Sequence, residues 1–216
     1  MGEAELDVQR RILTIYSHFI FYGNDAVPEL AQLLEQEIAS MWNEPQAAVL
    51  IDHLEYRVEF RISSEVRRDI EELEVLQNTD PRNNYFRIEA FVRGNISFVD
   101  GLGSNTGFLL LENLYPGSTT AAHEYGHTLG LDHPHHLDLR GQGVPGIMYP
   151  RGTLVDPLFQ YDPSKPAGAT GGTMHPVHRK VKKEDIEALR LHRLLFRNNK
   201  AIVGDFTNVY HWEHRN

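Results

Sequence analysis

The chain has 216 residues, a net charge of −9 and no cysteine, which suits one domain, or one domain split by a cleft into two lobes. The acidic balance argues against a nucleic-acid partner, because proteins that bind nucleic acids usually present a basic face. The missing cysteines exclude disulfides, thiolate metal ligands and a cysteine nucleophile.

The first segment, MGEAELDVQRR, is acidic and does not resemble the start of a signal peptide. No apolar run is long enough to span a bilayer. The compartment therefore stays open: the sequence as written fits a cytoplasmic protein, but also secretion by a non-standard route or the loss of an export signal. The oligomeric state is open too, and we expect a monomer.

Strands and helices alternate through the first half of the chain. Three strands are expected, at residues 12–22, 54–62 and 85–92. The strand 54–62, LEYRVEFRI, is the clearest, because apolar and charged residues alternate with a period of two. Residues 27–42 predict an amphipathic helix with Pro28 in its first turn, and residues 63–78 predict a second amphipathic helix with Ser64 as its cap.

Residues 96–113 predict two short strands around a glycine-rich bend, DGLGSN, which begins at Asp100. The bend is rich in oxygen-bearing residues, like a calcium loop. It lacks the spaced acids and the bidentate glutamate of such loops, so a plain turn is favoured and calcium is unsupported.

A helix is expected to begin after Ser118 or Thr119, either of which could cap it. Residues 134–176 are rich in proline and glycine and predict little regular structure. Residues 181–199 predict a closing helix, with acidic residues in its first turn and basic residues toward its end. Strands and one helix come first, then the helix that begins after Ser118 or Thr119, a long loop and a last helix, which is an α+β pattern.

The stretch HEYGHTLGLDH, residues 123–133, carries the chemistry. His123 and His127 are four apart, so on a helix they lie on the same face and could share one tetrahedral zinc. Glu124 lies beside the first ligand, where a carboxylate can act as a base on water. Gly130 can take the left-handed conformation that ends a helix, which lets His133 supply a third nitrogen. Three protein ligands leave a fourth position for water, as in catalytic zinc sites.

This stretch matches the HExxHxxGxxH pattern of the metzincin zinc peptidases at every defined position, and GIMYP, with Met148, resembles their methionine-bearing turn. The resemblance implies that Met148 forms a hydrophobic floor under the ligands, and that Tyr149 has a wall or packing role. Pro134 after the third histidine resembles serralysins, whereas Met-Tyr-Pro resembles matrixins, so no subfamily is assigned.

The resemblance also implies a fold. Residues 1–216 would form a single two-lobed catalytic domain, with lobes of about 1–130 and 131–216. The first lobe would hold a twisted, mostly parallel sheet with an antiparallel edge strand and the active-site helix. The second would be irregular and end in a helix.

In metzincins an extended substrate pairs with an edge strand above the cleft. Here that strand is expected within residues 104–111, with five candidate substrate-binding residues: Ser104, Asn105, Thr106, Gly107 and Phe108. An interior strand that meets no substrate is the alternative.

The pocket behind the zinc would be walled by residues 149–153 and by parts of the loop up to His178. His175 and His178 could line the cleft or hold a second ion, although loop histidines are more often simply solvated.

The expected function is that of a zinc-dependent endopeptidase, with one catalytic Zn²⁺ held by His123, His127 and His133 and with Glu124 as general base. Its partner would be a protein or peptide substrate. Two alternatives remain open: an exported effector or toxin-type protease domain, and a zinc-containing binding module without turnover.

Overall fold

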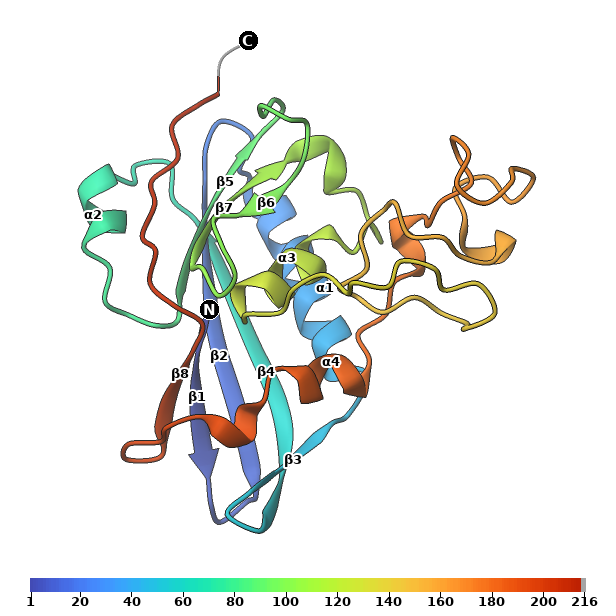
Figure 1. The fold of residues 1–216 in the computed structure, drawn as a ribbon. Helices are drawn as coiled ribbons and strands as arrows, with labels where there is room; N and C mark the ends of the chain where they lie inside the picture. The colour runs from blue at the N-terminus through green and yellow to red at the C-terminus, as the bar shows by residue number, and fades with distance from the viewer. Residues whose placement is uncertain (215–216) are drawn as a thin grey trace.

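A mixed sheet carries the fold in the computed structural model, which describes residues 1–214 (Figure 1). Its strands are β1 (Gly2–Asp7), β2 (Ile12–Tyr22), β3 (Ala48–Ile51), β4 (Leu54–Val66), β5 (Asn83–Glu89), β6 (Phe98–Val99), β7 (Thr106–Leu110) and β8 (Lys200–Val203). The strand order is β3-β4-β2-β5-β7-β6, and β1 joins β2 while β8 joins β1. The α+β prediction is therefore confirmed.

The sheet is less parallel than expected. Three pairings are parallel, β2 with β4, β2 with β5 and β5 with β7. The other four pairings, which bring in β1, β3, β6 and β8, are antiparallel. The prediction of a mostly parallel sheet is corrected to a mixed one, but both ends of the strand order, β3 and β6, are antiparallel edge strands.

Strand β2 lies at the centre of the sheet and is bonded along both edges. It pairs with β4 from Ile12 to Phe21 on one edge. On the other edge it pairs first with β1 and then, from His18 to Tyr22, with β5. Most of its side chains are also buried, on both faces of the sheet, which explains why its sequence is largely apolar on both faces.

The predicted helix of residues 63–78 is largely wrong. Strand β4 continues through Val66, and residues 63–66 pair with residues 18–21 of β2. Only Glu72–Leu76 forms a helix, α2. The amphipathic spacing in this segment was real, but the backbone hydrogen bonds offered by β2 outweigh a weak helix propensity. The third predicted strand is confirmed in position, although β5 begins at Asn83 and ends at Glu89.

The C-terminal prediction also needs correction. The described residues after position 188 form no α-helix: α4 covers only Lys183–Ala188, and Arg190 adopts a left-handed conformation with φ 51°. A tight turn at Asn198 and Asn199, both with positive φ, then leads into β8, which pairs with β1. Residues 200–203 thus return to the sheet of the N-terminal residues. No helix in the described part of the chain is long and apolar enough to cross a membrane.

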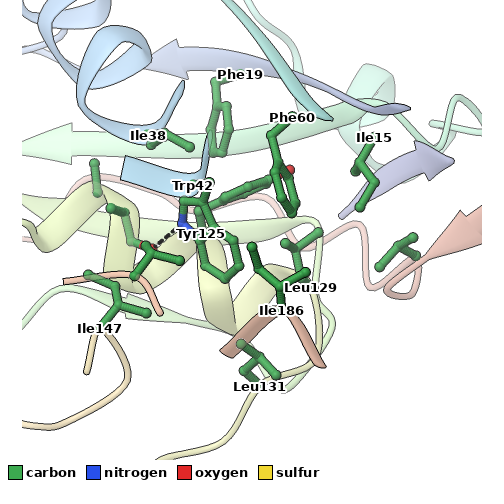
Figure 2. Packing of buried hydrophobic residues seen from close by; sticks show 14 of the residues in the cluster. Ile15, Phe19, Ile38, Trp42, Phe60, Tyr125, Leu129, Leu131, Ile147 and Ile186 are labelled. Atoms are coloured by element: carbon green, nitrogen blue, oxygen red, sulfur yellow. Dashed lines mark hydrogen bonds between the residues drawn. The ribbon is translucent and has the colours of Figure 1, made fainter. Parts of the chain in front are cut away.

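Helices α1 (Pro28–Asn43) and α3 (Thr120–Thr128) meet over the sheet in an aromatic core (Figure 2). Trp42 of α1 lies edge-on to Tyr125 of α3, with ring centroids 5.4 Å apart, and both side chains are fully buried. The Trp42 indole N–H donates to the carbonyl oxygen of Ala122 at 3.0 Å. Phe19 and Phe60 also pack against Tyr125. Helix α3 is therefore fixed from behind, and its other side carries the histidines.

Candidate metal centre

Three histidine side chains converge at the end of α3. His123 and His127 lie four residues apart in the helix, and His133 comes from the loop that follows it. The His133 Nε2 atom lies 3.1 Å from the Nε2 atoms of both His123 and His127. One ligand atom from each residue falls within 4.8 Å of the others, so the group could hold a metal ion such as zinc.

Backbone carbonyls hold the two helix rings from behind. The His123 Nδ1–H donates to the Ile147 carbonyl oxygen at 2.7 Å, and the His127 Nδ1–H donates to the Leu131 carbonyl oxygen at 2.7 Å. A proton on Nδ1 leaves the Nε2 lone pair free, and such outer hydrogen bonds orient metal-binding imidazoles. The donor set therefore fits a metal bound through three Nε2 atoms.

Burial favours the neutral imidazoles that a metal requires. Desolvation lowers the pKa of His123 well below its usual value, and nearby positive charges, Arg179 first, act in the same direction. Burial also lowers the pKa of His127 and of His133. At neutral pH all three rings can offer an unprotonated nitrogen.

Gly130 makes the turn that brings His133 into the group. Its φ is +95°, and its N–H donates to the His127 carbonyl oxygen at 3.0 Å. The Leu131 N–H donates to the Gly126 carbonyl oxygen, also at 3.0 Å. This pair of bonds is the Schellman ending of a helix. The predicted left-handed glycine is confirmed.

Glu124 is buried beside the first histidine of the group. Its side chain accepts no hydrogen bond from residues 1–214. Burial raises the pKa of Glu124 to about 7, while the positive charges of Arg179 and Arg151 act to lower it. A buried carboxylate without a protein partner is available to a water molecule or a substrate.

Met148 packs against α3 at Gly126, one residue before His127. Met148 is buried, and its Sδ atom would lie only 2.3 Å from a Cβ atom added at Gly126. The Trp42 ring would lie 3.3 Å from the same Cβ. Gly126 is therefore required for this contact, and sequence reasoning passed over it because it occupies an undefined position of the motif.

Two charged residues near α3 were also missed. Glu37 of α1 accepts hydrogen bonds from backbone N–H groups at the start of α3, including that of Ala122 at 3.4 Å. The N-cap residue itself, Thr119, is left-handed and does not cap with its side chain. Glu37 thus supplies the cap and the negative charge that a helix N-terminus favours. Its spacing from the motif, about eighty residues, gives no local signal of this role.

Arg179 is the second missed residue. It is buried, and it donates from Nε to Thr119 Oγ1 at 2.8 Å and from its two Nη atoms to the carbonyl oxygens of Tyr149 and Ser118, both at 3.3 Å. Burial lowers the pKa of Arg179 to about 10, and the charge of Glu124 opposes that shift. A buried guanidinium that forms no ion pair with a carboxylate of residues 1–214 therefore lies close enough to the three-histidine group for its charge to lower the pKa of all three histidines.

Tyr149 packs with the loops after α3. It lies against a small buried cluster made of Leu139, Val155 and Met174. The ring thus lies among loop side chains, as expected for a packing role.

His175 and His178 are neighbours, with ring centroids 6.0 Å apart. Within residues 1–214 they do not join a third potential ligand, so a second ion there gains no support.

The predicted substrate strand is not an edge of the sheet. Strand β7 pairs with β5 on one side, and on the other side Gly107 and Phe108 pair with Val99 and Phe98 of β6. The preceding residues, Ser104, Asn105 and Thr106, are hydrogen-bonded to the C-terminal tail. The edge assignment of Ser104–Phe108 is therefore wrong. Strand β6, which precedes β7 in the chain, pairs with the outer side of β7 and is itself the edge strand.

The glycine-rich bend behaves as a turn. The Asp100 carboxylate accepts a hydrogen bond from Thr106 Oγ1 at 2.6 Å and lies 2.9 Å from His211 Nε2. Its charge is thus already partnered within the protein. The three-histidine group is the one cluster of potential ligands in residues 1–214.

In sequence comparisons the chain matches no protein-family model and no curated protein. Its fold and its three-histidine group are therefore the grounds on which a function can be argued.

Proposed function

We propose that the chain is a zinc-dependent endopeptidase that resembles the metzincins. The observation that carries this proposal is the convergence of three Nε2 atoms, two of them on rings held at Nδ1 by backbone carbonyls. This arrangement uses three protein ligands, the number found in catalytic zinc sites, whereas structural zinc sites use four.

His123, His127 and His133 would hold the ion. When bound, zinc supplies Lewis acidity, which lowers the pKa of a coordinated water to about 7 and polarises a peptide carbonyl. Met148, packed at Gly126, would be the floor beneath the ligands. Its place in the buried core keeps the helix from shifting as substrate binds.

Glu124 is the general base in this proposal. Its carboxylate takes a proton from the attacking water and returns it to the amine nitrogen of the leaving peptide. Two features support the role: the residue follows the first ligand directly in α3, and its carboxylate accepts no hydrogen bond from the described residues. A binding module without turnover has no need of a free carboxylate at this position.

An extended substrate would pair with β6 and not with β7. Strand β6 stands at the end of the strand order and contacts α3. Strand addition at such an edge supplies backbone hydrogen bonds that are independent of the side chains of the substrate. The chemistry would therefore act on unfolded or extended segments of proteins.

The test compares the zinc-loaded protein with Glu124→Gln, using an unfolded protein as substrate and a chelator as a control. We expect chelator-sensitive cleavage by the original protein. The variant should keep one zinc per chain, by metal analysis, and lose at least about a hundredfold in rate, the usual scale of acid–base catalysis.

Cleavage by Glu124→Gln at the original rate would remove the base from the mechanism. Full zinc loading with no hydrolysis by the original protein would instead favour a binding module. His133→Ala serves as the metal control, since it should reduce zinc content on dialysis without touching the carboxylate.

A further inference from the structure

The surroundings of Glu124 are unusually positive for an acidic chain. The net charge of the protein is −9, yet the two charged side chains that act on the Glu124 carboxylate are both arginines, Arg179 and Arg151. A metal ion in the three-histidine group would add further positive charge. The site therefore attracts anions, and it does so through groups that differ in accessibility.

Arg151 is the accessible one. It is exposed, three residues after Met148, whereas Arg179 is buried and uses all three of its nitrogens on neighbouring oxygens. Arg151 donates from Nη2 to the Asn113 side-chain oxygen at 2.7 Å. Asn113, in the 3-10 turn Leu111–Asn113, is itself buried, so the guanidinium is positioned by a fixed acceptor.

Arg151 forms no ion pair with any carboxylate among residues 1–214. Several other arginines of the chain, such as Arg67, Arg82 and Arg140, are paired with nearby acids. An oriented guanidinium with free N–H groups is suited to bidentate binding of a carboxylate.

Polar aromatic side chains lie near enough to Arg151 to feel its charge. Tyr161 and His175 lie within the electrostatic range of Arg151, and their ring centroids are 4.4 Å apart. Tyr115, from the segment before α3, meets His175 edge-on at 6.4 Å. Arg151 is thus near groups that can donate hydrogen bonds, and these groups come from segments both before and after α3.

We propose that Arg151, fixed by Asn113, selects substrates that carry a carboxylate next to the scissile bond. This inference rests on the proposed peptidase function and deepens it. The carboxylate has two sources, the side chain of aspartate or glutamate and the free C-terminus of a peptide. Both present the same planar anion to the guanidinium.

The experiment uses matched peptides. One series replaces glutamate beside a cleaved bond by glutamine, and the other replaces a free C-terminus by its amide. For the original protein we expect kcat/KM to fall about tenfold or more in at least one series, the scale of a charge-assisted hydrogen bond. The series that responds identifies the source of the carboxylate.

Arg151→Gln should reduce the ratio of kcat/KM between the carboxylate peptide and its uncharged counterpart to about one. The control is Arg193→Gln, which removes an exposed arginine from the 3-10 turn Leu191–Arg193 and should leave this ratio unchanged. A ratio near one in the original protein, or a ratio that survives Arg151→Gln, overturns the inference. Either result can be obtained while cleavage itself continues, so the proposed peptidase function would stand.

A binding measurement covers the case without cleavage. Titration of the Glu124→Gln protein with the same peptides should give tighter binding of the carboxylate form, by about tenfold, and Arg151→Gln should cancel the difference. This binding difference, found together with no hydrolysis by the original zinc-loaded protein, would keep the carboxylate subsite and reject the peptidase. Equal binding of the acid and amide forms would reject the subsite.

Discussion

Helix α3 and the segment of residues 131–176 both contribute to the three-histidine group, but different forces hold them in place. Helix α3 is nearly all buried. It packs on Trp42 (Figure 2), and Met148 packs on it at Gly126. The later segment is mostly irregular (Figure 1). It has isolated bridges and a small buried cluster of its own. Two ligands are therefore fixed by close packing, and the third depends on the conformation of one turn.

The largest effect should come from crowding the packed side. Gly126→Ala places a Cβ 2.3 Å from Met148 Sδ, and overpacking of this kind usually costs about 1–3 kcal/mol. The free energy of unfolding of the metal-free protein, from urea denaturation, should fall by that amount.

Gly152→Ala is the matched change in the other region, because a Cβ there meets no atom within 4 Å and its φ is not positive. We expect a change within about 0.5 kcal/mol. Equal losses at both glycines would mean that the packed side and the loop side do not differ as described.

A smaller effect is expected from the turn. Gly130→Ala puts a side chain at φ +95°, a conformation that costs about 1–2 kcal/mol in an L residue. Because the turn positions His133, zinc affinity should weaken as well. Competition with a chromogenic chelator measures this affinity, and His133→Ala gives the largest loss expected.

Gly141→Ala controls for the backbone strain alone. Its φ is +75° and its surroundings are open, so stability should fall to a similar extent while zinc affinity stays unchanged. Loss of affinity in both variants would contradict the specific role of Gly130.

Met148→Leu should have the smallest effect. The exchange conserves volume, so unfolding should cost less than about 1.5 kcal/mol and activity on peptides should remain. Thermal denaturation and an activity assay check this. An inactive protein with an unchanged melting temperature would show that the sulfur does more than fill space.

The same contrast explains what the sequence could predict. The histidines at 123, 127 and 133 and the glycine at 130 act through spacing along one helix and its end, which is local information. Helix α1 and strand β4 were predicted by periodicity for the same reason. The tight turn at Asn198 and Asn199 also carries a local signal, since asparagine tolerates positive φ, but the predicted helix of residues 181–199 included both residues.

Contacts between distant segments could not be predicted. Glu37 reaches the start of α3 from another helix, and Arg179 binds carbonyl oxygens of two separate loops. Residues 63–66 joined the sheet because β2 offered them partners, which their own sequence does not reveal. The same holds for β6, which displaced β7 from the edge.

The unequal support of the three rings has a kinetic consequence. His123 and His127 are each held at Nδ1 by a carbonyl, whereas His133 is exposed and has no such bond among the described residues. An ion leaving the protein would dissociate from His133 first. The other two imidazoles would keep their orientation and could bind the next ion through two ligands. Zinc exchange would then be governed by the opening of a single loop, and would be faster than any event that requires the helix to unfold.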